Sequence, residues 1–347
     1  MDELRTLIAR QHADGQISHI TYWEPQAILE NINIRNGTSN LIQPPILAYA
    51  LWRIYEATGD KTVLAELYPA VQKFYSYILR ERDVRGVGLY GLVNPDESGE
   101  DNAPRFDAAQ LLPPQHDARQ NTENRHQLIA THASCHDNAQ CTSQHFWVED
   151  LAFNTYLYWN LTILSDIAYQ LQHHKDSHKW ARSAQTLKTA MRNKMFQNGT
   201  FHTLTGLQGI PTSDESWTQF LPLLAGLYTQ SEAHRLVHHV LLDTDRFWVA
   251  HGIPTVAPTD PAYQPAEPAW GEAWQHPHWR GPIWMVPHWC IYHGLLRYGF
   301  TKPAEVIKQK SHSLIERNGF REYFHPESGV GMGAHDFTWG GLVLDMQ

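Results

Sequence analysis

Cysteine is scarce in this sequence. Three cysteines, Cys135, Cys141 and Cys290, are spread over 347 residues. An odd and sparse set does not build a disulfide framework, so we expect free thiols and a reducing compartment, which predicts a cytoplasmic protein. Cys135 and Cys141 lie near His132 and His136, but the spacing fits no common zinc pattern, so no metal site is predicted.

Long apolar runs and an excess of positive charge are also missing. No run approaches the length that spans a bilayer, and the charged, amphipathic N-terminus does not resemble a secretory signal. The formal net charge of -9 argues against nucleic acid or an anionic membrane as the main partner. Nothing in the sequence indicates an oligomeric state.

Aromatic residues, by contrast, are abundant. The chain has 13 Trp and 15 Tyr, and aromatic residues make up 12% of it. Sugar-binding sites use aromatic faces as platforms, although most of these side chains are expected to fill the core. A hydrophobic content of 42% is enough for one large globular core.

Hydrophobic spacing of three and four residues predicts helices joined by irregular loops. The predicted helical segments are 42–60, 61–83, 147–172, 177–196, 220–230, 231–243, 282–299 and 303–319. Segments that are apolar on more than one face alternate with amphipathic ones, at about one hairpin per fifty residues. This pattern predicts an all-α toroid of helical hairpins, with an inner and an outer ring, built as a single domain over residues 1–347.

Four loops between these helices are polar and aromatic: 36–45, 95–107, 276–284 and 320–341. They carry Gln43-Pro44-Pro45, ESGEDNAPRFD from Glu97 to Asp107, WRGPIW from Trp279 to Trp284, and EYF followed by PESG within 322–329. With WVEDLAFN and FWVAHGIPTVAPTDP, these motifs resemble, in order and over nearly the whole chain, glycoside hydrolase family 63 and its close relatives, the mannosylglycerate and glucosylglycerate hydrolases. A single motif of this kind would be weak, whereas five collinear ones make the resemblance specific.

The resemblance implies an (α/α)6 barrel and an inverting glycosidase that needs no cofactor or metal. Such an enzyme uses one protonated and one ionised carboxyl group, roughly 6.5–9.5 Å apart, on opposite sides of the sugar. By resemblance Asp101 is the general acid and Glu322 the general base. Glu327 is the rival base, but its Pro/Gly surroundings are typical of a turn. Asp107 is expected to pair with Arg105 and hold the loop.

The same motifs suggest where a sugar binds. Gln43 offers both a donor and an acceptor, tryptophans stack on pyranose faces, and Arg280 can hold a carboxylate or a hydroxyl group. Burial of the tryptophans in the core and a structural ion pair of the arginine are the alternatives. The candidate substrate-binding residues are Gln43, Trp279, Arg280, Gly281, Trp284 and Trp23. Trp339 is a further candidate, and Asp336 is a candidate for orienting Glu322.

One departure from the family pattern concerns the start of the sequence. Family members usually carry an aromatic Trp-Asp segment upstream of the Gln-Pro-Pro motif, and this sequence begins too late to contain it. We therefore expect a fragment, a wrongly assigned start or a ring that closes differently, with part of the sugar site missing. An insert around 117–144, rich in His, Asn and Gln, is expected to cap the cleft and to influence specificity.

Three functions remain open at this stage. The first is an inverting glycosidase that cleaves a small α-glucoside or α-mannoside, such as a glycosylglycerate, or an oligosaccharide. The second is a degenerate family member that binds carbohydrate without turnover. The third is sugar epimerisation on the same fold, which would need a histidine pair such as His278 and His288.

Overall fold

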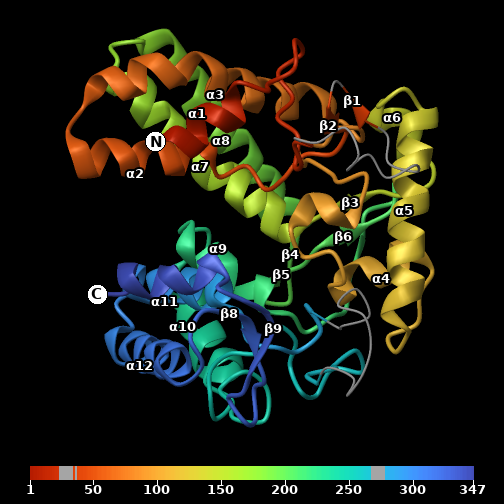
Figure 1. Ribbon diagram of the computed structural model, residues 1–347, viewed down its shortest axis with the longest axis vertical. Helices are drawn as coiled ribbons and strands as arrows, with labels where there is room; N and C mark the ends of the chain where they lie inside the picture. Colours follow the sequence, from red (N-terminus) through yellow and green to blue (C-terminus); the bar gives the residue numbers. More distant parts are fainter. Residues whose placement is uncertain (23–33, 36, 267–277) are drawn as a thin grey trace. The chain divides into compact units, whose positions relative to one another are not determined.

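The computed structural model describes residues 1–22, 34–35, 37–266 and 278–347 (Figure 1). Contacts within the chain divide it into two compact units. Unit 1 comprises Met1–Asp101, Glu123–Met195 and Thr203–Pro211, and unit 2 comprises Asn102–Thr122, Phe196–His202 and Thr212–Gln347. The assignment of residues 1–347 to a single domain stays a prediction.

Unit 1 is built on helices that the sequence predicted, together with the short N-terminal helix α1 (Asp2–Ile8). The predicted helices are α2 (Leu47–Thr58), α3 (Lys61–Glu81), α7 (Leu151–Gln170) and α8 (His174–Lys194). Helix α2 ends where the sequence predicted, at Gly59, whose φ of 68° is the left-handed conformation typical of helix ends. Asp60 then caps α3 by accepting a hydrogen bond from the Thr62 backbone N–H at 2.8 Å.

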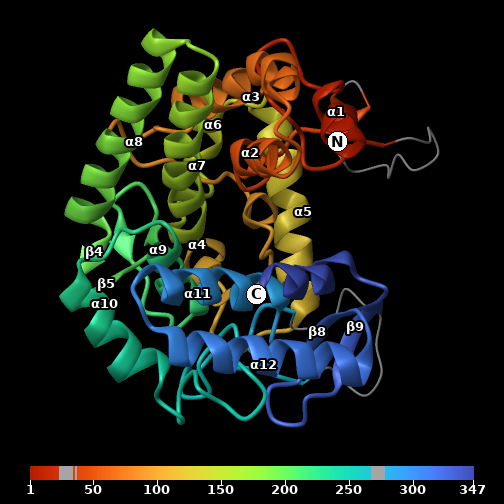
Figure 2. The same cartoon turned by 90° about the vertical axis from the view of Figure 1, so that its left-hand side faces the viewer.

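Helix α7 is the helix against which several other helices of unit 1 pack. It packs along α8, as Figure 2 shows, and also contacts α2 and α3. Two buried asparagines on α7 bond to neighbouring segments: Asn154 exchanges hydrogen bonds with the Tyr90 backbone, and Asn160 accepts from the Tyr49 N–H and from the Tyr75 hydroxyl. Because these polar groups are fully buried, their partners fix the positions of those segments.

The insert around 117–144 is largely helical. It contains α5 (Ala118–Ser134) and α6 (Ala139–Thr142), which the hydrophobic pattern did not indicate because α5 is polar on most faces. Short antiparallel strands complete unit 1. They are β1 (Ile34–Arg35) with β2 (Thr38–Ser39), and β3 (Val148–Glu149) with β6 (Leu204–Thr205) and β7 (Ile210–Pro211).

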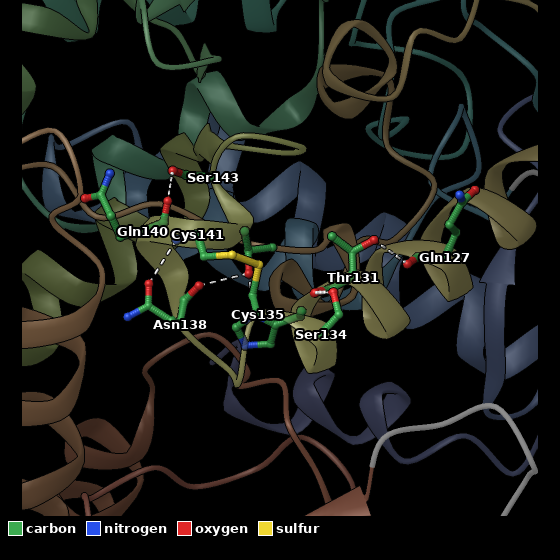
Figure 3. Close-up of a disulfide and its surroundings, with 10 residues drawn as sticks. Gln127, Thr131, Ser134, Cys135, Asn138, Gln140, Cys141 and Ser143 are labelled. Atoms are coloured by element: carbon green, nitrogen blue, oxygen red, sulfur yellow. Dashed lines mark hydrogen bonds between the residues drawn. A yellow bond between two sulfur atoms is a disulfide. The ribbon is translucent and has the colours of Figure 1, made fainter.

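A disulfide joins Cys135, at the end of α5, to Cys141 in α6 (Figure 3). The expectation of three free thiols was therefore wrong, because six residues of separation are enough when a tight turn brings the two helices together. Asn138 makes that turn, since its side chain accepts a hydrogen bond from the Cys141 N–H at 2.9 Å. The third cysteine, Cys290, takes no part in this disulfide and is buried. The argument for a reducing compartment thus loses its main support, and the cytoplasmic location stays a prediction.

Unit 2 contains a second helical hairpin, formed by α11 (Met285–Arg297) and α12 (Thr301–Asn318), which lie side by side in Figures 1 and 2. The shorter helices are η3 (Pro104–Phe106), α4 (Asp107–Gln110), η4 (Trp217–Phe220), α9 (Leu221–Leu224), α10 (Gln230–Leu236), η5 (Val237–Leu241) and η7 (Thr338–Asp345). The segments 220–230 and 231–243 are thus less regular than predicted.

Unit 2 also has two strand pairs. They are β4 (Phe196–Gln197) with β5 (Thr200–Phe201), and β8 (Arg321–Phe324) with β9 (Gly331–His335). The β8–β9 hairpin occupies the last of the four polar loops, where no strand was predicted. Its Phe324 packs in a core cluster with Ile283, Met285, Leu314 and Val343. Across the described ranges, no helix combines the length and apolar character needed to cross a membrane.

The disulfide gives a first prediction. A cross-link between residues six apart closes a short loop, and chain entropy then contributes about 2 kcal/mol to the free energy of unfolding. We expect the double variant Cys135→Ser, Cys141→Ser to lose this amount in urea unfolding. Thiol titration of the unfolded, unreduced protein should count one thiol and rise to three on reduction. Three thiols before reduction would contradict the pairing.

Candidate active site

The acidic loop between residues 95 and 107 begins as a tight 3-10 turn, η2 (Pro95–Ser98), in unit 1. Asn94 caps this turn by accepting a hydrogen bond from the Asp96 N–H at 2.9 Å. Gly99 ends it at a φ of 71°, a conformation that glycine adopts without strain. The Gln43 side chain supports the turn from outside, since its Nε2 donates to the Asp96 carbonyl at 2.9 Å.

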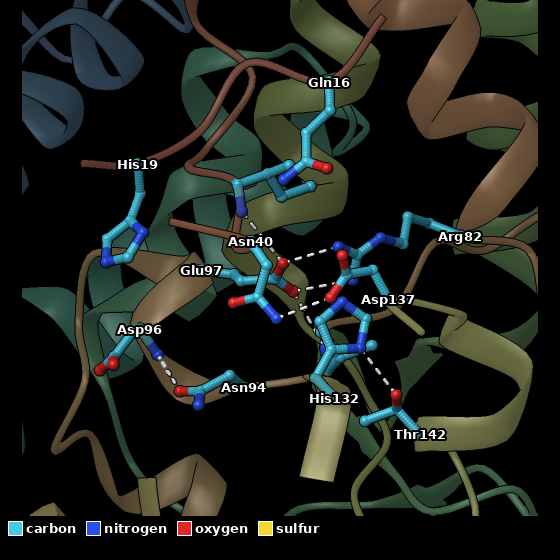
Figure 4. Close-up of polar contacts among 12 residues, drawn as sticks. Gln16, His19, Asn40, Arg82, Asn94, Asp96, Glu97, His132, Asp137 and Thr142 are labelled. Atoms are coloured by element: carbon cyan, nitrogen blue, oxygen red, sulfur yellow. Dashed lines mark hydrogen bonds and ion pairs between the residues drawn. The ribbon is translucent and has the colours of Figure 1, made fainter. Parts of the chain in front are cut away.

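Glu97 fixes this turn to the protein interior, and its side chain does not face solvent. Its carboxylate is fully buried and receives both terminal nitrogens of Arg82, at 2.8 and 2.6 Å. It also accepts the backbone N–H groups of Ile42 and Val93 at 3.1 and 3.0 Å. Figure 4 shows this carboxylate enclosed by its partners. Glu97 is therefore structural, in keeping with its assignment outside the catalytic pair.

Asp101 is placed differently. Its side chain is 29% exposed, and its Oδ2 lies 3.1 Å from Nη2 of Arg125 on α5. Arg125 also forms an ion pair with Asp96. Of these carboxyl groups in the loop, Asp101 is thus fixed by an arginine and still accessible, as a group that must reach a substrate has to be.

Asp107, in unit 2, is bound by Arg280. The two guanidinium nitrogens donate to both carboxylate oxygens, at 3.0 and 2.7 Å. Burial raises the pKa of Asp107 to about 7, against the hydrogen bonds and charge of Arg280, which lower it. The sequence had named Arg105 as the partner of Asp107. In the structure this carboxylate binds Arg280 and lies 4.0 Å from Nδ1 of His116.

Arg280 itself is fully buried, and it also donates to the backbone carbonyls of Asn102 and Pro114, at 3.2 and 2.6 Å. The guanidinium group of Arg280 is thus already hydrogen-bonded within the protein, which favours a structural ion pair over sugar binding. The next residue, Gly281, is equally constrained. Its φ is 147°, its N–H donates to the Thr255 hydroxyl at 3.0 Å, and an added Cβ would lie 2.9 Å from Tyr263. The Arg280-Gly281 step therefore shapes the loop around Asp107.

Glu322 lies on β8 opposite a β-bulge. Arg321 pairs with His335 and Tyr323 with Met332, so Gly333 and Ala334 together face Glu322. Gly333 has a φ of 64°, as in the bulge type that begins with a left-handed glycine. The Ala334 N–H donates to Glu322 Oε2 at 2.8 Å, which orients the carboxylate. Bulges next to active sites commonly redirect a side chain in this way.

The two other acids of this segment lie in turns. Glu327 is exposed, and its backbone N–H donates to Nδ1 of His325 at 3.2 Å, which is a turn contact as predicted. Asp336 is exposed and has a φ of 55°, a conformation that non-glycine residues seldom adopt. No contact between Asp336 and Glu322 is seen, so the proposed orienting role falls to the Ala334 N–H instead.

Aromatic rings cluster around Tyr323 of β8. Trp279 and Trp284 stack with ring centroids 4.0 Å apart and an angle of 8°, and Trp284 lies 5.0 Å from the ring of Tyr323. Both tryptophans are only 3% exposed, whereas Trp339, which contacts both, is half-buried. Trp339 therefore presents more ring surface than the two tryptophans chosen from the sequence. Trp23 lies outside the described residues.

Of the two histidines considered for epimerisation, His288 is not placed as an acid or base. His288 is fully buried, its Nε2 accepts the Ile253 N–H at 2.8 Å, and its Nδ1 bonds to the Ser311 hydroxyl at 2.8 Å. Burial lowers its pKa to about 3, so it is neutral near pH 7. His278 stacks edge-on against Tyr323.

Within the described ranges, no group of three or more potential metal ligands occurs.

Comparison with solved structures defines the class of protein. The structure matches that of a GH63 mannosylglycerate hydrolase from Thermus thermophilus in complex with Tris and D-glycerate. The TM-score is 0.86 at 26% identity, over 99% of this chain and 87% of the other. The glucose complex of the same enzyme gives a TM-score of 0.82 at 25% identity. The chain thus has the (α/α)6 fold predicted from its hairpins and motifs.

Sequence comparison then identifies the family. The profile of the mannosylglycerate hydrolase MGH1-like glycoside hydrolase domain matches residues 1–340, so the chain belongs to this family and is a glycosidase. It is 26% identical to mannosylglycerate hydrolase MGH1 of Selaginella moellendorffii, over 97% of this chain and 73% of that protein. It is 25% identical to glucosylglycerate hydrolase of Mycolicibacterium hassiacum, over 99% of this chain and 86% of that protein.

Sequence reasoning missed the arginines that bind the acidic loop. Arg82 and Arg125 lie outside every motif, and Arg125 belongs to a helix that the hydrophobic pattern did not reveal. The only available signal was the surplus of acids in the loop, which predicts basic partners without identifying them.

The bulge at Gly333 gives a second prediction. A Cβ at this position would lie 2.6 Å from Glu322 Oε2 and 2.6 Å from Tyr323 Cε1, and its φ is left-handed. Gly333→Ala should therefore cost about 1–3 kcal/mol of stability. It should also lower hydrolysis more than that cost explains, because it moves Glu322. Gly341→Ala, where no atom lies within 4 Å of the added Cβ, is the matched control. Equal effects at both positions would contradict this account.

Buried His288 gives a third prediction. Its pKa is about 3 in the folded protein and 6.5 when unfolded, so its contribution to stability is complete above pH 6.5 and is lost as the pH falls towards 3. Between pH 7 and pH 5 this loss is about 2 kcal/mol. His288→Gln should flatten the pH dependence by that amount in urea unfolding at the two pH values. An unchanged dependence would show that His288 is not the group responsible.

Proposed function

We propose that this glycosidase cleaves a small α-glucoside or α-mannoside with inversion, with Asp101 as general acid and Glu322 as general base. The observation that carries the proposal is the contrast among the motif acids. Glu97 and Asp107 are buried on arginines, whereas Asp101 is accessible and Glu322 is oriented by a backbone N–H. Catalytic carboxyl groups need both accessibility and fixed orientation.

In the proposed reaction, Asp101 gives its proton to the glycosidic oxygen as the bond from that oxygen to the anomeric carbon breaks. Glu322 takes a proton from a water molecule, whose oxygen bonds to the anomeric carbon from the opposite face. The products are a sugar of inverted configuration and the free alcohol. Asp101 is left ionised and Glu322 protonated, and exchange with solvent restores both.

Sugar recognition would involve Gln43 and the aromatic cluster. Gln43 uses Nε2 on the Asp96 carbonyl, and in the described part of the chain no donor bonds to its Oε1, which suits a sugar hydroxyl. Trp339, which contacts the rings of Trp279 and Trp284, would supply an apolar ring face for a pyranose. Arg280 and Gly281 would not contact the sugar and would influence its binding only through the conformation of the loop around Asp107.

The relatives support the substrate class. They are named mannosylglycerate and glucosylglycerate hydrolases, and a structurally similar enzyme was solved with D-glycerate and with glucose. A glycoside of glycerate is therefore the first substrate to test. The proposed chemistry requires no cofactor, since two carboxyl groups and water suffice. The helical insert around 117–144 is proposed to affect specificity, and the cytoplasmic location is likewise a proposal.

Two substitutions test the catalytic pair. Asp101→Asn cannot donate the proton and Glu322→Gln cannot accept one, so each should lower kcat on mannosylglycerate or glucosylglycerate by at least about 100-fold. Glu327→Gln, five residues from Glu322 in the same loop, is the control and should retain the wild-type rate. Near-full activity of either catalytic variant would exclude its assignment.

NMR of the first product formed tests the stereochemistry. An inverting enzyme releases the β-anomer from an α-glycoside before mutarotation mixes the two forms. Initial release of the α-anomer would overturn the proposed mechanism. Binding of the glycosides without any turnover by the wild-type chain would instead identify a carbohydrate-binding protein that has lost catalysis.

A further inference from the structure

Helix α5 is attached to the acidic loop at the position of Arg125. The Asn94 side chain donates a hydrogen bond to the Arg125 carbonyl at 2.9 Å, and the same Asn94 caps the turn that leads to Asp101. The backbone of Arg125 is therefore bound to the loop independently of the contacts that its side chain makes. All of these groups belong to unit 1.

The Arg125 guanidinium then bridges two acids of the loop. It pairs with Asp96 through Nη1, and its Nη2 lies 3.1 Å from Oδ2 of Asp101. The Arg125 side chain is only 14% exposed, about half the value for Asp101. A fixed arginine that holds Oδ2 leaves Oδ1 as the more available oxygen, and in the described ranges no donor bonds to Oδ1.

The charge on this arginine is secure. Burial opposes it, but the negative charges of Asp101 and Asp96 outweigh burial and raise the pKa of Arg125 above its ordinary value. The guanidinium thus stays positive throughout a reaction cycle in which the charge of Asp101 changes. A permanent positive charge at this distance interacts weakly with the protonated carboxyl group and strongly with the carboxylate.

From this geometry we infer that Arg125 is a positioning residue that promotes proton donation by Asp101. The inference rests on the proposed function, in which Asp101 is the general acid. Arg125 holds Oδ2, directs Oδ1 towards the glycosidic oxygen and stabilises the carboxylate that remains when the proton has moved to that oxygen. The electron pair of the broken bond stays on the leaving oxygen, which the transferred proton neutralises. No further reactant is needed.

The leaving group provides the test. A glycerate leaving group must be protonated as it departs, whereas fluoride departs from a glycosyl fluoride with little help from an acid. A residue that acts through Asp101 should therefore matter for the glycoside and not for the fluoride. A residue that only supports the fold should affect both substrates alike.

Arg125→Gln is to be measured with mannosylglycerate or glucosylglycerate, whichever the wild type cleaves faster, and with the α-fluoride of the same sugar. Loss of one charge-assisted contact should lower kcat/KM on the glycoside by about 10- to 100-fold. The rate on the fluoride should stay within about threefold of the wild type. Arg125→Lys keeps the charge and should recover part of the glycoside activity.

Two controls accompany these variants. Asp101→Asn should show the same dependence on the leaving group, in a stronger form. Arg85→Gln removes another arginine of unit 1, one that pairs with the buried carboxylate of Glu149 at 2.8 Å, and should show no such dependence. Thermal unfolding and circular dichroism establish that each variant is folded.

The outcomes separate the inference from the function on which it rests. If Asp101→Asn shows the leaving-group pattern and Arg125→Gln does not, only the inference is wrong. If Arg125→Gln impairs both substrates equally, Arg125 is a structural residue and the inference is again wrong. If Asp101→Asn impairs both substrates equally, or the wild type cleaves neither glycoside, the proposed function fails and the inference fails with it.

Discussion

The pairing of arginines with the carboxylates of the acidic loop is the constraint on which the site depends. Residues 95–107 carry five acids, whose charges repel one another and could not be buried alone. Arg82 neutralises Glu97, Arg280 neutralises Asp107, and Arg125 bridges Asp96 and Asp101. Two of these pairs are buried and fix the loop at each end, while the third leaves its carboxylate accessible. The loop therefore leaves Asp101 accessible and uses Glu97 and Asp107 as anchors.

A different device positions the second carboxyl group. Glu322 belongs to a short hairpin, and the β-bulge at Gly333 and Ala334 supplies both the space for its side chain and the N–H that holds it. The bulge works only with glycine at position 333, because an added Cβ would collide with the carboxylate that it serves. A backbone N–H thus orients the Glu322 carboxylate, whereas arginine side chains orient the carboxylates of the acidic loop.

The disulfide and helix α5 show why part of this arrangement was not predicted. The Cys135–Cys141 pair closes a turn between two helices whose residues are mostly polar. Polar helices lack the hydrophobic period from which helices are predicted, so no helix was predicted in this insert. Yet this helix carries Arg125, which contacts the acid assigned from the motif. A helix without an apolar stripe can still be fixed by hydrogen bonds and ion pairs along its length, as α5 is at Arg125.

The sequence by itself determined the long helices, because their apolar period and their capping residues, such as Gly59 and Asp60, are local properties. Its collinear motifs also identified the family. Only the tertiary structure decided which acids are buried and which arginines bind them. Arg280 follows Asp107 by 173 residues, and Arg125 lies beyond Asp101 on an unpredicted helix. Such pairs arise when the folded chain brings distant charges together in a medium from which water is excluded, and no local pattern of residues encodes them.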